Sequence, residues 1–130
     1  MQILSSDVRV HSSRLLLHSY YGNKFSKHRK IRSFGSKAAV ITCGKDGAYY
    51  ADDSEQGYVP VFKVDAVDTT GAGDVFHGAF ATGLTKGWNL REIVTFSSAV
   101  SAIKCTKIGG RVGIPTFDEV MEFMDTQASG

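Results

Sequence analysis

The sequence predicts an α/β layered domain, because short apolar runs typical of strands come first and amphipathic segments typical of helices follow. Residues 38–42 form an apolar run that ends shortly before Gly44, which is typical of a buried parallel strand. Residues 71–73 lie where the last expected strand gives way to the first expected helix. This strand–loop–helix junction also favours an α/β fold.

Two further strands are expected between these features. Residues 48–51 form one of them, after a turn at 45–47, and residues 58–64 alternate enough to form the other. Pro60 indicates that the latter strand lies at an edge of the sheet or begins there, because proline cannot donate a main-chain hydrogen bond.

The first helix is expected over residues 73–85, where an apolar stripe has helical spacing: Val75, Phe76, Ala79, Phe80 and Leu84. Gly78 and Gly83 lower the helix propensity, so we expect them to permit close packing or the close approach of a ligand. Gly87 fits a C-terminal cap of this helix.

Two later helices share one start signal. A helix over 89–107 begins with Asn89 and has Glu92 three residues on, and the last helix opens in the same way with Thr116 and Glu119. Each pair is a capping box, which satisfies free N–H groups at a helix start. The apolar residues expected to face the core are Ile93, Phe96, Val100, Ile103, Val120 and Phe123.

Composition narrows the class of protein. The 130 residues have the apolar and charged fractions of a globular domain with a core of its own. No apolar run approaches the about 20 residues of a membrane span, and no signal-peptide pattern opens the chain. Cys43 and Cys105 lack metal-ligand spacing, so we expect reduced thiols in a cytoplasmic protein, with a disulfide as the alternative.

Charge divides the chain into two parts. Residues 1–36 hold seven basic and one acidic residue, whereas the remainder holds eight basic and twelve acidic residues. We therefore predict a basic N-terminal extension over residues 1–34 and a second part over residues 35–130. A solvated or poorly ordered extension is the preferred interpretation. A nucleic-acid contact and a truncation or reading-frame artefact are the alternatives, and no membrane partner is expected.

The segment 68–74, Asp-Thr-Thr-Gly-Ala-Gly-Asp, carries the most informative chemistry. Its glycines let ligand oxygens approach main-chain N–H groups, and a helix start supplies unpaired donors with a partial positive charge, which together favour a phosphate. Asp74 would repel that phosphate, so its expected role is to take a proton from an attacking hydroxyl. The site therefore suits phosphoryl transfer, and the alternative is an aspartate that caps an ordinary helix.

Residues 68–80 resemble the C-terminal signature of the ribokinase-like (PfkB) family of carbohydrate kinases. Residues 41–47 are similar to the family's strand-end Thr-x-Gly-x-x-Gly segment, and residues 107–115 are similar to the turn that closes its last nucleotide-contacting helix. The resemblance covers residues 35–123. It implies a ribokinase-like α/β fold, a layered sheet with helices packed on it, of which this chain would be the C-terminal, nucleotide-side part.

The resemblance also implies an ATP-dependent kinase that acts on a sugar, polyol or nucleoside hydroxyl, with Mg²⁺ on the nucleotide and K⁺ as a candidate monovalent ion. Asp74 would be the catalytic base, and the anion hole would be formed by Gly71, Ala72 and Gly73. The nucleotide-side residues would be Thr42, Gly44, Gly47, Thr70, Ser98 and Gly109, of which Ser98 stands where many relatives have asparagine. Asp68 and Thr70 would hold the monovalent cation, and the other role open to Asp68 is to fix the loop by bonding its own backbone.

The chain lacks a recognisable sugar-side half of this family, which motivates a second hypothesis. In that hypothesis the chain is a truncated, non-catalytic nucleotide-binding fragment of such a kinase. Exposed strand edges would then favour association, including a homodimer. His77 is interpreted as a helix-face residue rather than a catalytic one.

Overall fold

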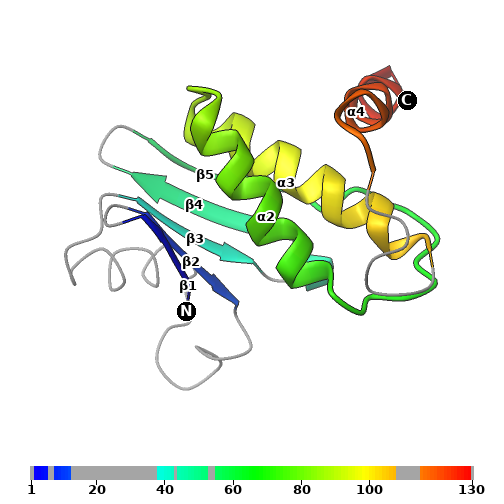
Figure 1. Cartoon of the computed structure of the whole chain (residues 1–130), viewed down its shortest axis with the longest axis horizontal. Coiled ribbons are helices and arrows are strands. Elements are labelled where there is room, and N and C mark those ends of the chain that lie inside the picture. The colour runs from blue at the N-terminus through cyan, green and yellow to red at the C-terminus, as the bar shows by residue number, and fades with distance from the viewer. Residues whose placement is uncertain are drawn as a thin grey trace. The chain divides into compact units, whose positions relative to one another are not determined.

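A computed structural model of the chain describes residues 2–5, 8–12, 38–42, 44–52, 55–107 and 115–129. The chain divides into two compact units, of which one ends at Val61 and the other begins at Phe62. The first unit contains a five-stranded sheet, and the second contains the helices α2, α3 and α4 (Figure 1). The predicted α/β class is therefore confirmed.

The sheet of the first unit is mixed. Its strands lie in the order β1-β2-β3-β4-β5, where β2 and β3 are parallel and the other neighbours are antiparallel. Their bounds are Gln2–Ser5, Val8–Ser12, Ala38–Thr42, Ala48–Asp52 and Gln56–Val59. Strands β1 and β2 come from the predicted N-terminal extension, and the division at residue 34 stays a prediction.

Strand β3 is the buried strand that the sequence predicts. Four consecutive residues from Ala38 to Ile41 are at most 8% exposed. Because successive side chains of a strand point to opposite faces, both faces of β3 are covered. A short 3₁₀ turn, η2 (Gly44–Asp46), connects β3 to β4. Gly47 follows it with a φ of 83°, and a Cβ there would lie 2.5 Å from the Val59 carbonyl oxygen, so glycine is required.

The predicted strand over residues 58–64 is wrong in its position. Strand β5 begins earlier and ends at Val59, directly before Pro60. Pro60 has no N–H to continue the ladder with β4, so pairing stops there. The strand begins early because the hairpin is tight: the Asp52 N–H donates to the Glu55 carbonyl at 2.8 Å, and the Glu55 N–H donates to Asp52 Oδ1 at 2.7 Å.

The three predicted helices are confirmed in the second unit as α2 (Ala72–Thr85), α3 (Leu90–Cys105) and α4 (Phe117–Ser129). The N-cap bond forms at both helix starts, and the reciprocal main-chain bond of a capping box forms at Thr116 and Glu119. The Glu92 N–H donates to Asn89 Oδ1 at 2.9 Å, and the Glu119 N–H donates to Thr116 Oγ1 at 3.2 Å while Glu119 Oε2 accepts the Thr116 N–H at 2.8 Å. The expected cap glycine, Gly87, has a φ of 73° directly after α2.

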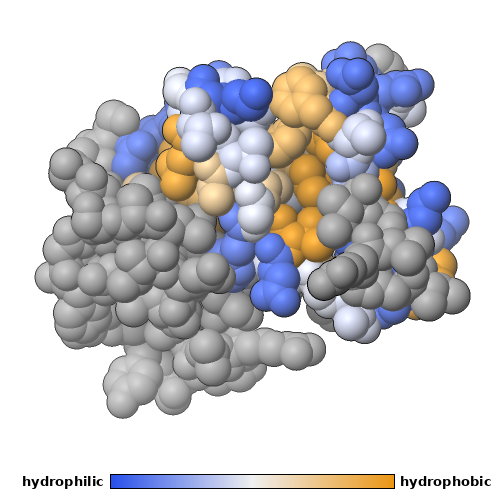
Figure 2. Space-filling view, in the orientation of Figure 1, coloured by the Kyte–Doolittle hydropathy of each residue, from blue (hydrophilic) through white to orange (hydrophobic). Residues whose placement is uncertain are grey.

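The core of the second unit lies where α3 meets α2 and α4. Its buried members are Ala79, Phe96, Ala99, Val100 and Val120. The partly buried side chains of Phe62 and Phe123 pack against it with ring centroids 5.4 Å apart. Figure 2 shows apolar surface between α2 and α4. On α4, Phe117 and Met121 remain 43% and 37% exposed.

Helices α2 and α3 pack closely because α2 has a glycine at their contact. A Cβ added to Gly83 would lie 2.9 Å from Ile93 Cγ2, which is closer than real contacts allow. A Cβ on Gly78 would meet nothing within 4 Å. The expectation of close packing is therefore confirmed at Gly83, whereas Gly78 is exposed and makes no such contact.

These two glycines provide a matched test of packing. Both substitutions to alanine gain helix propensity, of about 1 kcal/mol, so their difference isolates the contact with Ile93. We expect Gly83→Ala to be less stable than Gly78→Ala by about 1–3 kcal/mol, because Ile93 is buried and branched at Cβ. Urea unfolding of both variants measures this difference, and equal stabilities would contradict the packing argument.

Candidate functional site

The loop over residues 68–74 enters helix α2 through a glycine in an unusual conformation. Gly71 is the N-cap residue with a φ of 76° and provides no side-chain cap. The Ala72 N–H donates to the Thr69 carbonyl at 3.1 Å, and the Val75 N–H donates to the Gly71 carbonyl at 3.0 Å. The N–H groups of Gly73 and Asp74 have no hydrogen-bond partner among the residues that the structure describes. They are free donors at a helix start.

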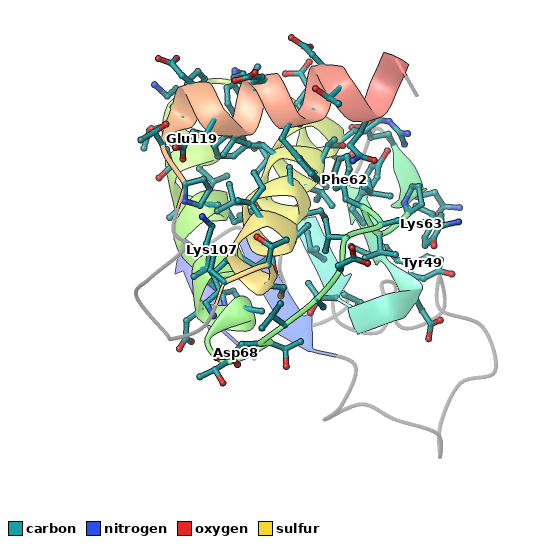
Figure 3. The ribbon with its side chains drawn as sticks, turned by 90° about the vertical axis from the view of Figure 1, so that its right-hand side faces the viewer. Tyr49, Phe62, Lys63, Asp68, Lys107 and Glu119 are labelled. Atoms are coloured by element: carbon teal, nitrogen blue, oxygen red, sulfur yellow. The ribbon has the colours of Figure 1, made fainter. Side chains whose placement is uncertain are left out.

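Besides the hydrogen bonds within it, the loop has hydrogen bonds to the end of helix α3. The Cys105 carbonyl oxygen accepts the N–H groups of Val67 at 2.8 Å and Asp68 at 3.1 Å. Ser101, one turn earlier on α3, donates from its Oγ to the Ala72 carbonyl at 3.2 Å. Figure 3 shows Asp68 on the loop and Lys107 just beyond the end of α3. The loop is therefore fixed on both sides of the last turn of α3.

Asp68 has the backbone role that the sequence analysis gave as one of two. Its Oδ1 accepts the Thr70 N–H at 2.9 Å, which is the bond of an Asx turn. The role of Asp68 and Thr70 toward a monovalent cation stays a prediction. No group of three or more metal-ligating side chains occurs within the described part of the chain.

Asp74 lies in the first turn of α2 and is exposed to solvent. A carboxylate in this position is stabilised by the partial positive charge of the helix start, by about 0.3–1 kcal/mol at an exposed site. Its side chain is accessible, and it lies beside the free N–H groups of Gly73 and of its own backbone. A Cβ on Gly73 would meet nothing within 4 Å, which leaves open space beside these donors.

His77 lies one turn after Asp74 on the same helix. Burial lowers the pKa of its ring below the usual 6.5, while the Asp74 carboxylate and the Gly73 carbonyl both raise this pKa. Both ring nitrogens of His77 are buried and have no hydrogen-bond partner in the described residues. The Gly73 carbonyl therefore lies near the ring but does not accept a hydrogen bond from it. The net result is a preference for the neutral ring.

The remaining predicted residues do not all lie in this unit. Thr42, Gly44 and Gly47 lie in the first unit at the end of β3 and in the turn that follows, where the Gly47 N–H donates to the Gly44 carbonyl at 3.1 Å. Ser98 is half-buried in α3, and Gly109 lies outside the described residues. Within the second unit, the predicted residues from Asp68 to Asp74 lie together at the start of α2.

One buried residue near the loop escaped the sequence analysis. Lys104 of α3 is fully buried, and its Nζ has no hydrogen-bond partner among the described residues. The available signal was its helical spacing, because Lys104 lies three residues after Ser101 and seven after the buried Ser97. A lysine in such an inward row is unusual, since lysine is rarely buried without a partner.

A hollow of about 550 Å³ lies between the end of α3 and helix α4, and Figure 3 labels Lys107 and Glu119 of its wall. Its lining residues are Ile103, Lys107, Pro115, Glu119, Glu122, Phe123 and Thr126. None of the predicted site residues belongs to this lining. The free donors at the start of α2, rather than this hollow, therefore define the candidate site.

Known proteins resemble this chain in both sequence and fold. A protein-family model described as "pfkB family carbohydrate kinase" matches residues 25–117 of the chain. The chain belongs to the pfkB family of carbohydrate kinases. It is 39% identical to a ribokinase of Staphylococcus aureus over 89 residues, which are 68% of this chain and 29% of that protein. A fructokinase-2 of Zea mays is 43% identical over 63% of this chain and 27% of its own length.

Solved structures of the pfkB family show the same fold. The Thermotoga maritima ribokinase aligns with a TM-score of 0.80 and 34% identity over 92% of this chain and 42% of its own. A putative ribokinase II of E. coli, in complex with ATP and Mg²⁺, aligns with a TM-score of 0.82 and 27% identity over 92% of this chain and 39% of its own. The ribokinase-like fold is therefore confirmed. The chain spans about 30% of the length of the curated relatives.

No helix in the described ranges of this pfkB-family chain is both long and apolar enough to cross a membrane.

The lowered pKa of His77 predicts a pH dependence of stability. Because the folded state disfavours the protonated ring, the unfolded chain binds a proton first as the pH falls below 6.5, and the folded state loses stability. Urea midpoints of the wild type and His77→Gln between about pH 8 and about pH 5 measure this effect. We expect a smaller acid-side loss in the variant. Identical pH profiles would contradict the assignment.

Proposed function

We propose that this chain provides the phosphate-binding and catalytic-base segment of an ATP-dependent carbohydrate kinase. The observation that carries the proposal is the start of α2, where an exposed carboxylate lies beside two free main-chain donors. The donors are the N–H groups of Gly73 and Asp74, and the carboxylate is that of Asp74. Such a pair suits a reaction in which one group holds negative charge and another accepts a proton.

The free N–H groups would hold the phosphoryl group that is transferred. They are fixed before the ligand arrives, because the loop is bonded to Cys105 and Ser101 of α3. Preorganised donors of this kind stabilise the negative charge of a transition state without having to reorient. The positive end of the α2 dipole adds to the same effect.

Asp74 would accept the proton of the acceptor hydroxyl. Its carboxylate is accessible from solvent, so an incoming hydroxyl can reach it. The oxygen freed of its proton then attacks the terminal phosphorus of ATP, the bond from that phosphorus to the bridging oxygen breaks, and ADP leaves. Asp74 later releases the proton to water.

The residues present fit the groups that a relative binds. A putative ribokinase II of E. coli has been solved with ATP and Mg²⁺. Phosphate oxygens suit the free donors and the open space beside Gly73. Mg²⁺ would be held largely by the phosphates, with Asp74 as the nearby carboxylate, and would offset their charge. We propose Asp68 and Thr70 for K⁺, and Thr42, Gly44, Gly47, Ser98 and Gly109 for the rest of the nucleotide.

The acceptor class follows from the family, whose matched members here are named ribokinase, fructokinase and 6-phosphofructokinase. We propose a sugar or similar polyol as the substrate. A cytoplasmic location, the division into residues 1–34 and 35–130 and a homodimer remain parts of the same proposal. Nucleic-acid and membrane partners are not part of it.

A second candidate function is favoured by one observation. The chain spans about 30% of the length of its curated relatives, so it is a candidate nucleotide-binding fragment that does not turn over a sugar. Calorimetry with Mg-ATP, combined with ADP release in the presence of ribose and fructose, discriminates the two. Binding without turnover favours the fragment, and turnover favours the enzyme.

Substitution of Asp74 tests the catalytic role. We expect Asp74→Asn to keep ATP binding and to lower sugar-dependent ADP release by about 10²–10⁴, because the amide cannot accept the hydroxyl proton. The matched control is Asp118→Asn, which removes an exposed aspartate from the first turn of another helix, α4. Its rate should equal that of the wild type. Unchanged turnover in Asp74→Asn would refute the role of the base.

A further inference from the structure

Lys104 poses an electrostatic problem that the proposed mechanism leaves unsolved. Its side chain is completely buried, and its Nζ makes no hydrogen bond to any described residue. An ammonium group taken out of water without a partner destabilises the protein that contains it. Such a group is explained when a ligand supplies the missing negative charge.

The direction of Lys104 follows from its neighbours on α3. Ser101 faces the first turn of α2, since its Oγ donates to the Ala72 carbonyl at 3.2 Å. Ile93, eight residues earlier, meets Gly83 of α2, so the row that contains both residues faces α2. Lys104 continues this row by one turn, three residues after Ser101.

Continuing that row brings Lys104 to the loop before α2. The helices run antiparallel along this contact, because Gly83 meets Ile93 and Ala72 meets Ser101. The turn after Ser101 therefore lies level with the residues that precede Ala72. The Cys105 carbonyl confirms this level, since it accepts the N–H groups of Val67 and Asp68. Helical side chains also tilt toward the N-terminus of their own helix, which directs Lys104 back toward the start of α2.

Two independent observations thus point to the start of α2 as an anion site. The start of α2 has free N–H groups at Gly73 and Asp74, and the buried Lys104, whose Nζ has no partner among the described residues, lies on the row of α3 that leads to it. We propose that Lys104 is an anion-binding residue, whose ammonium is the fixed counter-charge for phosphate oxygens bound at the start of α2. The inference rests on the proposed function and adds a residue to it.

The proposal has an energetic signature that a structural role would not produce. Without ligand, the buried charge should destabilise the chain, so replacing it with an apolar side chain of similar length should raise the unfolding midpoint. With ligand, the same replacement removes a charge-assisted contact and should weaken binding. A lysine that merely supports the fold would lower the midpoint when replaced and leave the affinity intact.

The experiment compares Lys104→Met with Lys63→Met in the full 130-residue chain. Lys63 is an exposed lysine of the same unit that has no part in the candidate site, so its replacement changes the net charge equally. Mg-ATP is the probe, and its binding is measured by calorimetry and by the ligand-induced rise in melting temperature. We expect Lys104→Met to melt higher without ATP and to bind ATP at least about tenfold more weakly, with Lys63→Met within about threefold of the wild type.

Other outcomes would overturn the inference in distinguishable ways. If the wild type and Lys104→Met bind ATP equally, the proposed function stands and the role of Lys104 fails. If the wild type itself does not bind ATP, both fail. An equal loss in Lys63→Met would show a general charge effect instead. Should Lys104→Met not fold, Lys104→Gln is the second neutral variant, and loss of folding in both would show that the lysine is structural.

Discussion

Two hydrogen bonds to the Cys105 carbonyl position the site. The last carbonyls of a helix lack intrahelical partners, so the end of α3 offers acceptors that the N–H groups of Val67 and Asp68 fill. The Asx turn of Asp68 and the left-handed conformation of Gly71 then redirect the chain into α2. The free donors of Gly73 and Asp74 are thus held by α3, and the core around Phe96 keeps α3 in place.

Two ionisable residues near the start of α2, Asp74 and His77, have different environments. Asp74 is exposed and benefits from the helix dipole, whereas burial keeps His77 neutral in preference to charged. His77 therefore adds little positive charge near Asp74 at neutral pH. For the proposed phosphate, main-chain dipoles and Lys104 are the candidate sources of positive charge among the described residues at this place.

Local signals predicted the helices well, because their ends are determined by neighbouring residues. Asn89 with Glu92 defines the start of α3 at the sequence level, and the expected bond from the Glu92 N–H to Asn89 Oδ1 is present. The Glu92 carboxylate accepts from the Asn89 side-chain amide rather than from its main-chain N–H. The strand before Pro60 was placed wrongly, because the Asp52 turn, rather than the alternation of side chains, sets where β5 begins. Lys104 escaped notice because burial depends on tertiary packing, and its residue type alone predicts an exposed position.

The proposed phosphate site joins two segments of the second unit. The loop at 68–74 leads into α2, and the bonds from Val67, Asp68 and Ser101 attach it to the last turn of α3. Ser101 and Ala72 are 29 residues apart, so the donors are fixed only when α2 and α3 have packed together. In the proposed function, phosphate binding and turnover are separable properties. Binding would need these donors, whereas turnover would also need an acceptor hydroxyl held beside Asp74.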